Sequence, residues 1–322
     1  MSTSTGGNGV ADAARRLAAE IGKAVVGQGQ AVEEVLAAFF AGGHVLLEGV
    51  PGVGKTLLAK ALARALDLSF ARVQFTPDLM PADVVGTSVF RPERGAFELR
   101  RGPVFTEVLL ADEVNRTPPK TQAALLEAME ERQVTIDGQR HPLPASFFAI
   151  ATQNPVEYEG TYPLPEAQLD RFLCKVRMGY PTAEEERELL RRSAGGFDAH
   201  DLDAAGVRPV LAGEELALLR ARARSLPAAE PVQEYVARLV RESRELPRVR
   251  LGASPRAAVS LLACARARAA LRGAEWLTPD DVKAMARPVL RHRLLLRPEA
   301  ELEGATPDDV VGDLLESVEI PR

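Results

Sequence analysis

The sequence predicts an α/β protein, with a five-stranded parallel sheet of doubly wound type between helices and a smaller C-terminal region that is helical. As far as Pro181, short apolar runs of strand length alternate with helical segments, the pattern of parallel strands joined by crossover helices. From Thr182 onward the chain carries repeated helix-start signals and no convincing strand. The 322 residues and 46% hydrophobic content allow about two domains. We expect a disordered tail at 1–8, an α/β core at 9–181 and a helical domain at 182–322.

The first half of the core is predicted to place helices around two strands. The Ser/Thr/Gly-rich opening residues lack the composition of a packed segment. The periodic segments that follow are helices at 11–21 and 31–40, a strand at 44–47, a helix at 57–66 and a strand at 70–75. The segment 79–86 is ambiguous.

Two hairpins and three more strands complete the predicted core. Residues 87–105 alternate around Arg94-Gly95, and residues 134–142 turn at Asp137-Gly138, both signals for antiparallel hairpins. A helix is expected from Pro118-Pro119. The remaining buried parallel strands are predicted at 108–111, 147–152 and 174–178.

Helix-start signals dominate the C-terminal region. Thr182 followed by Glu185 fits a capping box, in which each side chain bonds the other residue's backbone N–H. Three later helices are predicted to start at a Ser or Thr N-cap followed by Pro, namely Ser254, Thr278 and Thr306. The segment 195–210 reads as loop-rich.

A glycine-rich loop, Gly49-Val50-Pro51-Gly52-Val53-Gly54-Lys55-Thr56, lies between the strand at 44–47 and the helix at 57–66. Strand, glycine loop and helix in this order are the context of a phosphate-binding P-loop. Backbone N–H groups curl around the phosphates, Lys55 adds a point charge, and Thr56 is a ligand for Mg²⁺. The residues expected to contact nucleotide are Gly49, Pro51, Gly52, Val53, Gly54, Lys55, Thr56 and Leu57. The sequence therefore predicts that the chain binds a nucleoside triphosphate with Mg²⁺.

An acidic pair, Asp112-Glu113, ends the buried strand at 108–111. Ligands of a doubly wound sheet lie outside the carboxyl ends of its strands, so the pair is expected beside the P-loop. Asp112 is predicted to hold Mg²⁺, and Glu113 to polarise a water as general base. A solvated acidic cap on the next segment is the alternative.

Asn154 follows the strand at 147–152, next along the chain from the acidic pair's strand. An amide there can bond both the attacking water and the γ-phosphate without adding charge that competes with Mg²⁺. Asn before Pro is also an ordinary turn residue. Its place at a strand end favours the catalytic interpretation.

Composition also bears on the partners, the cellular compartment and the metal ligands that the protein can have. A formal charge of -5 and a pI near 5.6 give no bulk footprint for nucleic acid, so no nucleic-acid partner is expected. No signal peptide or membrane-length apolar run is evident, which favours a cytoplasmic protein. Cys174 and Cys264 read as reduced core thiols. The scattered histidines read as structural or surface residues rather than metal ligands: His44, His141, His200 and His292.

Taken together, these residues resemble the MoxR family of AAA+ ATPases. The resemblance rests on the P-loop, on Gln74 to Leu79, on Ala111 to Arg116 running into Pro118 to Gln122, on Ala151 to Pro155, and on Leu164 to Phe172. It covers nearly all of residues 25–290 and implies an AAA+ core with a helical lid. We see no departure at the nucleotide residues.

The resemblance implies roles for two arginines. Arg171 matches the arginine finger that reaches a neighbour's site, although from the residues alone an intrachain ion pair with Asp170 or Glu166 is the alternative. Arg256, a cation in the first turn of a helix where the dipole disfavours it, matches sensor 2, which would contact the γ-phosphate of its own subunit; a solvated arginine is the alternative. Arg116 reads either as a second contact to the neighbour or as a surface residue.

Other segments acquire expected roles from the same resemblance. Val25, Val26, Gly27 and Gln28 match the segment that packs by adenine, and otherwise read as a turn between helices. The two hairpins match the helix-2 insert and the pre-sensor-1 hairpin, which tend to face the pore or substrate surface of a ring. As bare hairpins they could equally be passive edges.

The sequence therefore indicates a Mg²⁺-dependent ATPase that acts as a homo-oligomeric ring, expected to be a hexamer. The resemblance implies a chaperone-like factor that remodels or matures partner proteins with von Willebrand factor A domains, in some cases through metal insertion. A magnesium-chelatase-like motor subunit, a nucleotide-gated assembly scaffold with little dependence on turnover, and a DNA-remodelling AAA+ protein are the rival interpretations.

Overall fold

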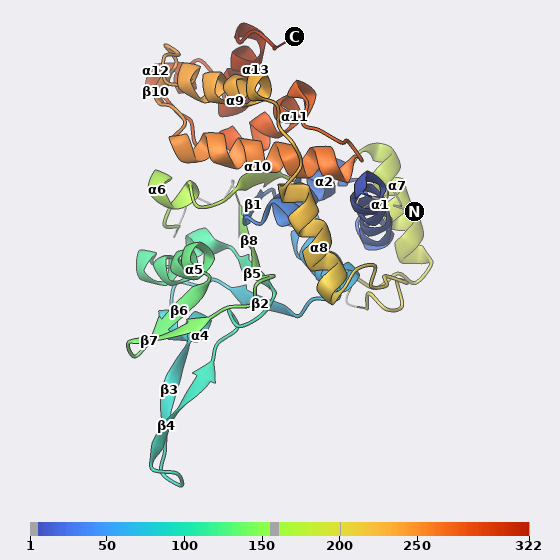
Figure 1. Ribbon diagram of the computed structural model, residues 1–322. Helices are drawn as coiled ribbons and strands as arrows, with labels where there is room; N and C mark the ends of the chain where they lie inside the picture. The colour runs from blue at the N-terminus through green and yellow to red at the C-terminus, as the bar shows by residue number, and fades with distance from the viewer. Residues whose placement is uncertain (1–5, 155–160, 200, 322) are drawn as a thin grey trace.

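A parallel five-stranded sheet forms the centre of the chain in a computed structural model that describes residues 6–154, 161–199 and 201–321 (Figure 1). The strand order is β2-β5-β8-β1-β9, and each neighbouring pair is parallel. The strands are β1 (Val45–Glu48), β2 (Phe70–Gln74), β5 (Val108–Asp112), β8 (Phe148–Gln153) and β9 (Cys174–Arg177). The predicted α/β sheet is confirmed. Residues 1–5 of the predicted tail, Pro155 and His200 lie outside the described residues.

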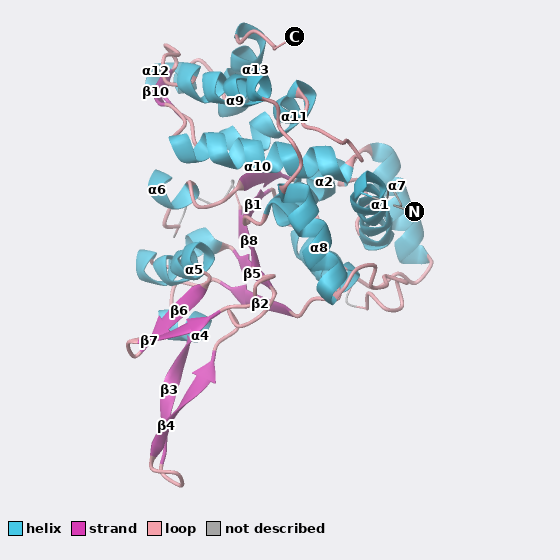
Figure 2. Cartoon of the chain, viewed as in Figure 1, coloured by secondary structure: helices cyan, strands magenta, loops and turns pink. Residues whose placement is uncertain are grey.

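Helices surround the sheet and fill the C-terminal region (Figure 2). Those of the first part are α1 (Gly6–Ala24), α2 (Gly29–Ala41), α3 (Lys55–Ala65), α4 (Pro81–Val85), the 3₁₀ turn η1 (Val114–Arg116), α5 (Pro119–Glu131) and α6 (Glu166–Leu169). Those of the second part are α7 (Ala183–Ala194), α8 (Gly213–Arg224), α9 (Glu230–Glu242), α10 (Pro255–Leu271), α11 (Pro279–Leu290), α12 (Pro298–Leu302) and α13 (Pro307–Ser317). The N-caps at Thr182, Ser254, Thr278 and Thr306 are where the sequence predicts them. Within the described ranges, no helix is both long and apolar enough to cross a membrane.

Successive residues of each strand face opposite sides of the sheet, as the period of an extended chain requires. Val45 and Leu47 join one buried cluster, which includes α1, α2, α3 and the C-terminal helices. Leu46 between them joins the other cluster, under α4 and α5. Both faces of the sheet are therefore covered, which explains why its strands read as continuous apolar runs.

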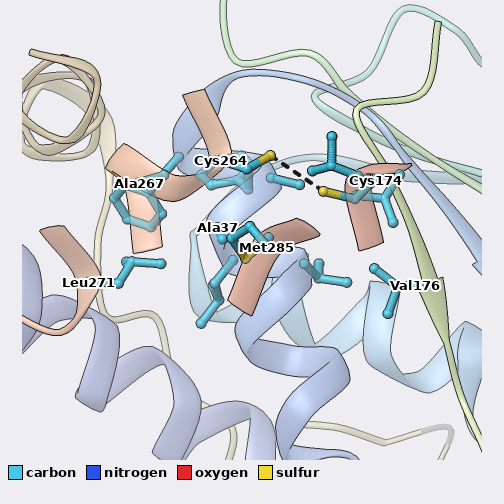
Figure 3. Packing of buried hydrophobic residues seen from close by; sticks show 14 of the residues in the cluster. Ala37, Cys174, Val176, Cys264, Ala267, Leu271 and Met285 are labelled. Atoms are coloured by element: carbon cyan, nitrogen blue, oxygen red, sulfur yellow. Dashed lines mark hydrogen bonds between the residues drawn. The ribbon is translucent and has the colours of Figure 1, made fainter. Parts of the chain in front are cut away.

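The C-terminal helices pack directly on the sheet edge. In Figure 3, Ala37 of α2 and Met285 of α11 lie between Ala267 and Leu271 of α10 on one side and Val176 of β9 on the other, all in one continuous buried cluster. Cys174 and Cys264 lie across this contact as free, buried thiols, with their Sγ atoms 3.4 Å apart. The prediction of buried free thiols is confirmed, while their proximity was not foreseen.

Two hairpins extend from the α4–α5 side of the molecule. β3 (Gly86–Arg91) pairs with β4 (Ala96–Arg101) and projects well beyond the body (Figure 1). β6 (Gln133–Ile136) pairs with β7 (Gln139–Pro142) through Asp137 and Gly138, which both have positive φ, 49° and 77°. Positive φ at both central residues suits the tight turn that the sequence signal predicts.

Two expectations differ from the structure. Helix α1 begins at Gly6, inside the segment predicted as a tail. The region predicted without strands contains a short antiparallel pair, β10 (Val249–Leu251) with β11 (Leu295–Leu296). Strands of three and two residues are too short for the alternating pattern by which a strand is recognised.

Candidate functional site

The P-loop is the turn between β1 and α3. Gly52 and Gly54 have φ of 86° and 93°, in the left-handed region that favours glycine. At Gly49, a β-carbon would stand 2.5 Å from the carbonyl oxygen of Met178, so only glycine fits there. Helix α3 starts at Lys55, whose Nζ donates to the carbonyl oxygen of Gly49. The turn therefore presents the N-terminus of α3 and a lysine to one cleft, an arrangement suited to phosphate.

That cleft, of about 410 Å³, lies at the carboxyl ends of the central strands. It is lined by Pro51, Gly52, Gly54, Lys55, Thr56, Leu57, Lys60, Asp112, Glu113, Asn154 and Ala199. The predicted P-loop, acidic pair and Asn154 therefore meet at one place. Gly49 and Val53 shape the turn beneath it. The chemistry of this donor set fits a magnesium-bound nucleotide, since lysines and backbone N–H groups suit phosphate and the hydroxyl and carboxylate suit the cation.

The segment Val25 to Gln28 joins α1 to α2. Gly27 has a φ of 73°, and the side-chain amide of Gln28 donates to the carbonyl oxygen of Gly179 at 3.0 Å. This bond ties the segment to the chain that leaves β9. Contact with adenine here stays a prediction.

Asp112 is 7% exposed and held by two side chains. The hydroxyl of Thr152 donates to Oδ1 at 2.5 Å, and Arg72 donates to Oδ2 from Nε at 3.0 Å and Nη2 at 2.7 Å. Sequence reasoning missed Arg72. The available signal was that Arg72 is a polar residue on β2, the strand next to β5. It lies two positions before Gln74, and Gln74 pairs in register with Asp112.

Glu113 has a φ of 57°, and its N–H donates to the hydroxyl of Thr152 at 2.9 Å. Its carboxylate Oε2 accepts from Gln74 at 2.6 Å and from Nη1 of Arg116 at 3.1 Å. Thr152 therefore fixes both acidic residues, and Gln74 and Arg116 hold the Glu113 carboxylate. Arg116 lies beside its own subunit's acidic pair, where its proposed contact to a neighbour stays a prediction.

Asn154 follows β8, beside β5, and is 5% exposed. Its place next to the acidic pair in the cleft is where the strand order predicts it. Alignment of a water by this amide stays a prediction.

Arg171 lies at the amino ends of the sheet strands, opposite the carboxyl ends at which the P-loop cleft lies. It belongs to residues 170–173, which we call the finger loop, immediately before β9. Because β9 runs parallel to β1, with Val45 opposite Cys174 and Glu48 opposite Arg177, the finger loop precedes the strands and the P-loop follows them. A strand length of about 13 Å separates the two. Arg171 pairs through Nε with Oε2 of Glu130 at 2.9 Å, rather than with Asp170 or Glu166.

The finger loop is held by Arg293, whose side chain is 2% exposed. Its guanidinium donates to Oδ1 of Asp170 at 2.6 Å and to the carbonyl oxygens of Phe172 and Leu173 at 2.8 and 3.1 Å. Asp170 is therefore committed to Arg293. This arginine also escaped sequence reasoning, because nothing local to residue 293 indicates a partner more than a hundred residues away.

Arg256 lies with Arg171 and not in the P-loop cleft. Its Nη2 pairs with Oε1 of Glu130 at 2.8 Å. Both arginines line a second pocket of about 260 Å³, whose charged residues are Glu130, Arg132, Asp170, Arg171, Arg256 and Arg293. The predicted contact of Arg256 with the γ-phosphate of its own subunit does not fit this arrangement. The reason is packing, since α10 begins beside the finger loop, where Ser254 bonds Asp170 at 3.2 Å.

Two histidines are structural, as predicted. His44 is buried, with Nε2 donating to the carbonyl oxygen of Met129 at 3.0 Å and Nδ1 accepting from the N–H of Ala149 at 2.9 Å. Burial lowers the pKa of His44 to about 4. Burial likewise lowers the pKa of His292 well below its ordinary value.

Comparison with known proteins agrees with this geometry. Residues 44–174 match the model of the ATPase family associated with various cellular activities (AAA), and residues 241–314 match an AAA lid domain. The protein named Chaperone MoxR1 of Mycobacterium tuberculosis is 42% identical, over 94% of this chain and 81% of the relative. The chain belongs to the MoxR family of AAA+ ATPases.

Two further relatives of this MoxR-family chain match along its length. YeaC of Bacillus subtilis is 46% identical, over 94% of this chain and 92% of the relative. A 2.00 Å crystal structure of a Cytophaga hutchinsonii protein assigned as an ATPase superposes with a TM-score of 0.88 at 40% identity, over 97% of this chain and 96% of that one. The similarity to these relatives therefore spans both the AAA+ core and the lid of this chain.

Proposed function

We propose that this MoxR-family protein is a Mg²⁺-dependent ATPase whose active site is shared between subunits. The observation that carries the proposal is the separation of the P-loop from the finger loop by the length of the parallel strands. A single subunit cannot bring Arg171 to its own nucleotide across that distance. The proposed site therefore joins the P-loop cleft of one subunit to the arginine pocket of the next.

Lys55, Thr56 and Asp112 hold the triphosphate and its cation in this proposal. The Lys55 amine offsets phosphate charge, and the turn around Gly52 and Gly54 directs N–H groups into the cleft. Mg²⁺, when bound by Thr56 and Asp112, would neutralise further charge on the phosphates. Arg72, already paired with Asp112, competes with the cation for that carboxylate.

Glu113 and Asn154 act on the water. The Glu113 carboxylate accepts a proton from the attacking water, and the Asn154 amide orients that water. Gln74 and Arg116 both bond Oε2 of Glu113 in this structure, so the other carboxylate oxygen, Oε1, is the atom proposed to act on the water. Both residues line the cleft that contains the P-loop.

The neighbour supplies Arg171 and Arg256. Their guanidinium groups share one pocket, and two such cations would stabilise charge that spreads over the γ-phosphate oxygens during transfer. In comparable systems one such arginine contributes about 10³ to 10⁵ in rate. The closed assembly that gives every subunit a neighbour is a ring, which we propose to be a hexamer.

The cellular role that we propose is chaperone-like maturation of partner proteins in the cytoplasm. It is supported by the name of the M. tuberculosis relative and by family resemblance, which suggests partners with von Willebrand factor A domains and, in some cases, metal insertion. The projecting β3–β4 hairpin, with Phe90 50% and Phe97 73% exposed, supplies a surface for such a partner. Co-purification of the chain with a candidate partner, and loss of that partner's activity without it, would test this role.

Mixed assemblies test the shared site. Arg171→Ala protein should bind ATP normally, and its rate of hydrolysis should fall by a factor of about 10³ or more. Glu113→Gln protein should also be inactive, but because its own cleft is impaired while the arginine pocket that it offers to its neighbour is intact. In an equal mixture, roughly a quarter of interfaces combine an intact cleft with an intact arginine pocket, so activity should reappear. Arg187→Ala, an exposed arginine on α7, is the control that should change nothing. Absence of activity in every mixture would refute the proposal.

A further inference from the structure

One carboxylate, that of Glu130, holds both arginines of the second pocket. Oε2 pairs with Nε of Arg171 at 2.9 Å and Oε1 pairs with Nη2 of Arg256 at 2.8 Å. The three side chains come from the end of α5, the finger loop and the start of α10. No segment of the sequence indicates this meeting, since the residues are 41 and 126 positions from Glu130.

Helix electrostatics disfavour two of these charges at their positions. Glu130 lies in the last turn of α5, where the helix dipole repels an anion, and Arg256 lies in the first turn of α10, where the dipole repels a cation. Each charge offsets the other across the pocket. The pair is also partly exposed, with 32% of the Glu130 side chain and 51% of the Arg256 side chain accessible. Exposed ion pairs of this kind add little to stability, so a fold-stabilising role explains the arrangement poorly.

The pocket has the character of a phosphate receptor. Its charged lining comprises Arg132, Arg171, Arg256 and Arg293 against Glu130 and Asp170, and Asp170 is already bound to Arg293. Arginine side chains are long and flexible, and two guanidinium groups on one face repel each other. A single carboxylate between them keeps both near one point. Arg171 approaches Glu130 through Nε, at 2.9 Å from Oε2.

We propose that Glu130 is a positioning residue for hydrolysis in the neighbouring subunit. It orients Arg171 and Arg256 toward the partner's γ-phosphate and limits their motion before assembly. The proposal rests on the shared active site argued above and extends it, because it assigns a function to a carboxylate on the arginine side of the interface. Glu130 touches neither the nucleotide nor the water in this scheme.

Glu130→Ala and Glu130→Gln proteins test the proposal, with Glu131→Ala as the matched control on the same turn of α5. We expect kcat at saturating ATP to fall about 10- to 100-fold in Glu130→Ala, the range that follows from displaced catalytic groups. The kcat of Glu130→Gln protein should lie between those of the wild type and Glu130→Ala, because its amide oxygen still accepts from one guanidinium. ATP affinity, the thermal midpoint and the ATP-dependent assembly seen by light scattering should match the wild type.

The mixing experiment shows on which subunit Glu130 acts. Glu113→Gln subunits carry an intact Glu130 and intact arginines, so adding them to Glu130→Ala protein should restore turnover. Wild-type kcat in Glu130→Ala, or a loss that Glu113→Gln subunits cannot rescue, would overturn the inference. These results are distinct from failure of the shared site. If the shared site is wrong, Arg171→Ala protein will remain active, or Glu113→Gln subunits will fail to rescue it. If only the inference about Glu130 is wrong, Arg171→Ala protein will be inactive and rescued by Glu113→Gln subunits, while Glu130→Ala protein is fully active.

Discussion

His44 should make the folded protein sensitive to acid. Its pKa falls from 6.5 to about 4, chiefly because the ring is buried, with Arg132 and Arg220 nearby also disfavouring the charged form. In the unfolded chain the ring titrates near its ordinary value, so the unfolded state binds a proton that the folded state rejects between pH 6.5 and 4. Stability contributed by neutral His44 is therefore complete above pH 6.5 and is lost as pH falls toward 4. At about 1.4 kcal/mol per pKa unit, the loss is about 3 kcal/mol.

Urea unfolding followed at several pH values between 4 and 7.5 measures this effect. His44→Gln keeps an amide able to bond in the pocket and removes the titration, so its free energy of unfolding should fall about 3 kcal/mol less over that range than the wild type's. Carboxylates titrate in both proteins and cancel in the difference. Identical slopes for His44→Gln and wild type would refute the reasoning.

Three further predictions concern single contacts. Arg72→Ala removes from Asp112 a guanidinium that competes with Mg²⁺ for the carboxylate. The Mg²⁺ concentration for half-maximal ATPase should therefore fall about fivefold, equivalent to about 1 kcal/mol for a half-exposed partner. An unchanged Mg²⁺ titration would contradict this. Arg293→Ala leaves the carboxylate of the finger loop without its buried partner and should lower the free energy of unfolding by about 1–3 kcal/mol, as checked by urea titration; a wild-type midpoint would count against it. Cys174 and Cys264 are buried, so a thiol reagent should react with them at an appreciable rate only after the protein is unfolded, and rapid modification of the native protein would argue against their burial.

Sequence reasoning succeeded where the signal is local. The P-loop is a continuous strand–loop–helix, and its glycines are required by backbone angles that the motif itself implies. The hairpin turn at Asp137-Gly138 and the N-cap at Thr182 are likewise decided by a few neighbouring residues. Asp112 and Asn154 could be placed together because parallel strands end at a common edge of the sheet.

It failed where the outcome depends on packing between distant segments. Arg72 reaches Asp112 only because β2 pairs with β5 in a particular register. The position of Arg256 depends on how α10 packs against α2 and β9, which no local pattern reveals. Glu130 illustrates the same limit, since its two partners come from elements that are far apart in the chain.

The dependence of specific ATPase activity on protein concentration tests the shared site most directly. Each subunit alone should bind ATP and hydrolyse it very slowly, because Arg171 lies a strand length from its own P-loop. Specific activity should therefore rise steeply with concentration and level off where light scattering shows complete assembly in the presence of ATP. Constant specific activity down to concentrations at which the protein is monomeric would contradict the account, since it would mean that one subunit completes its own active site.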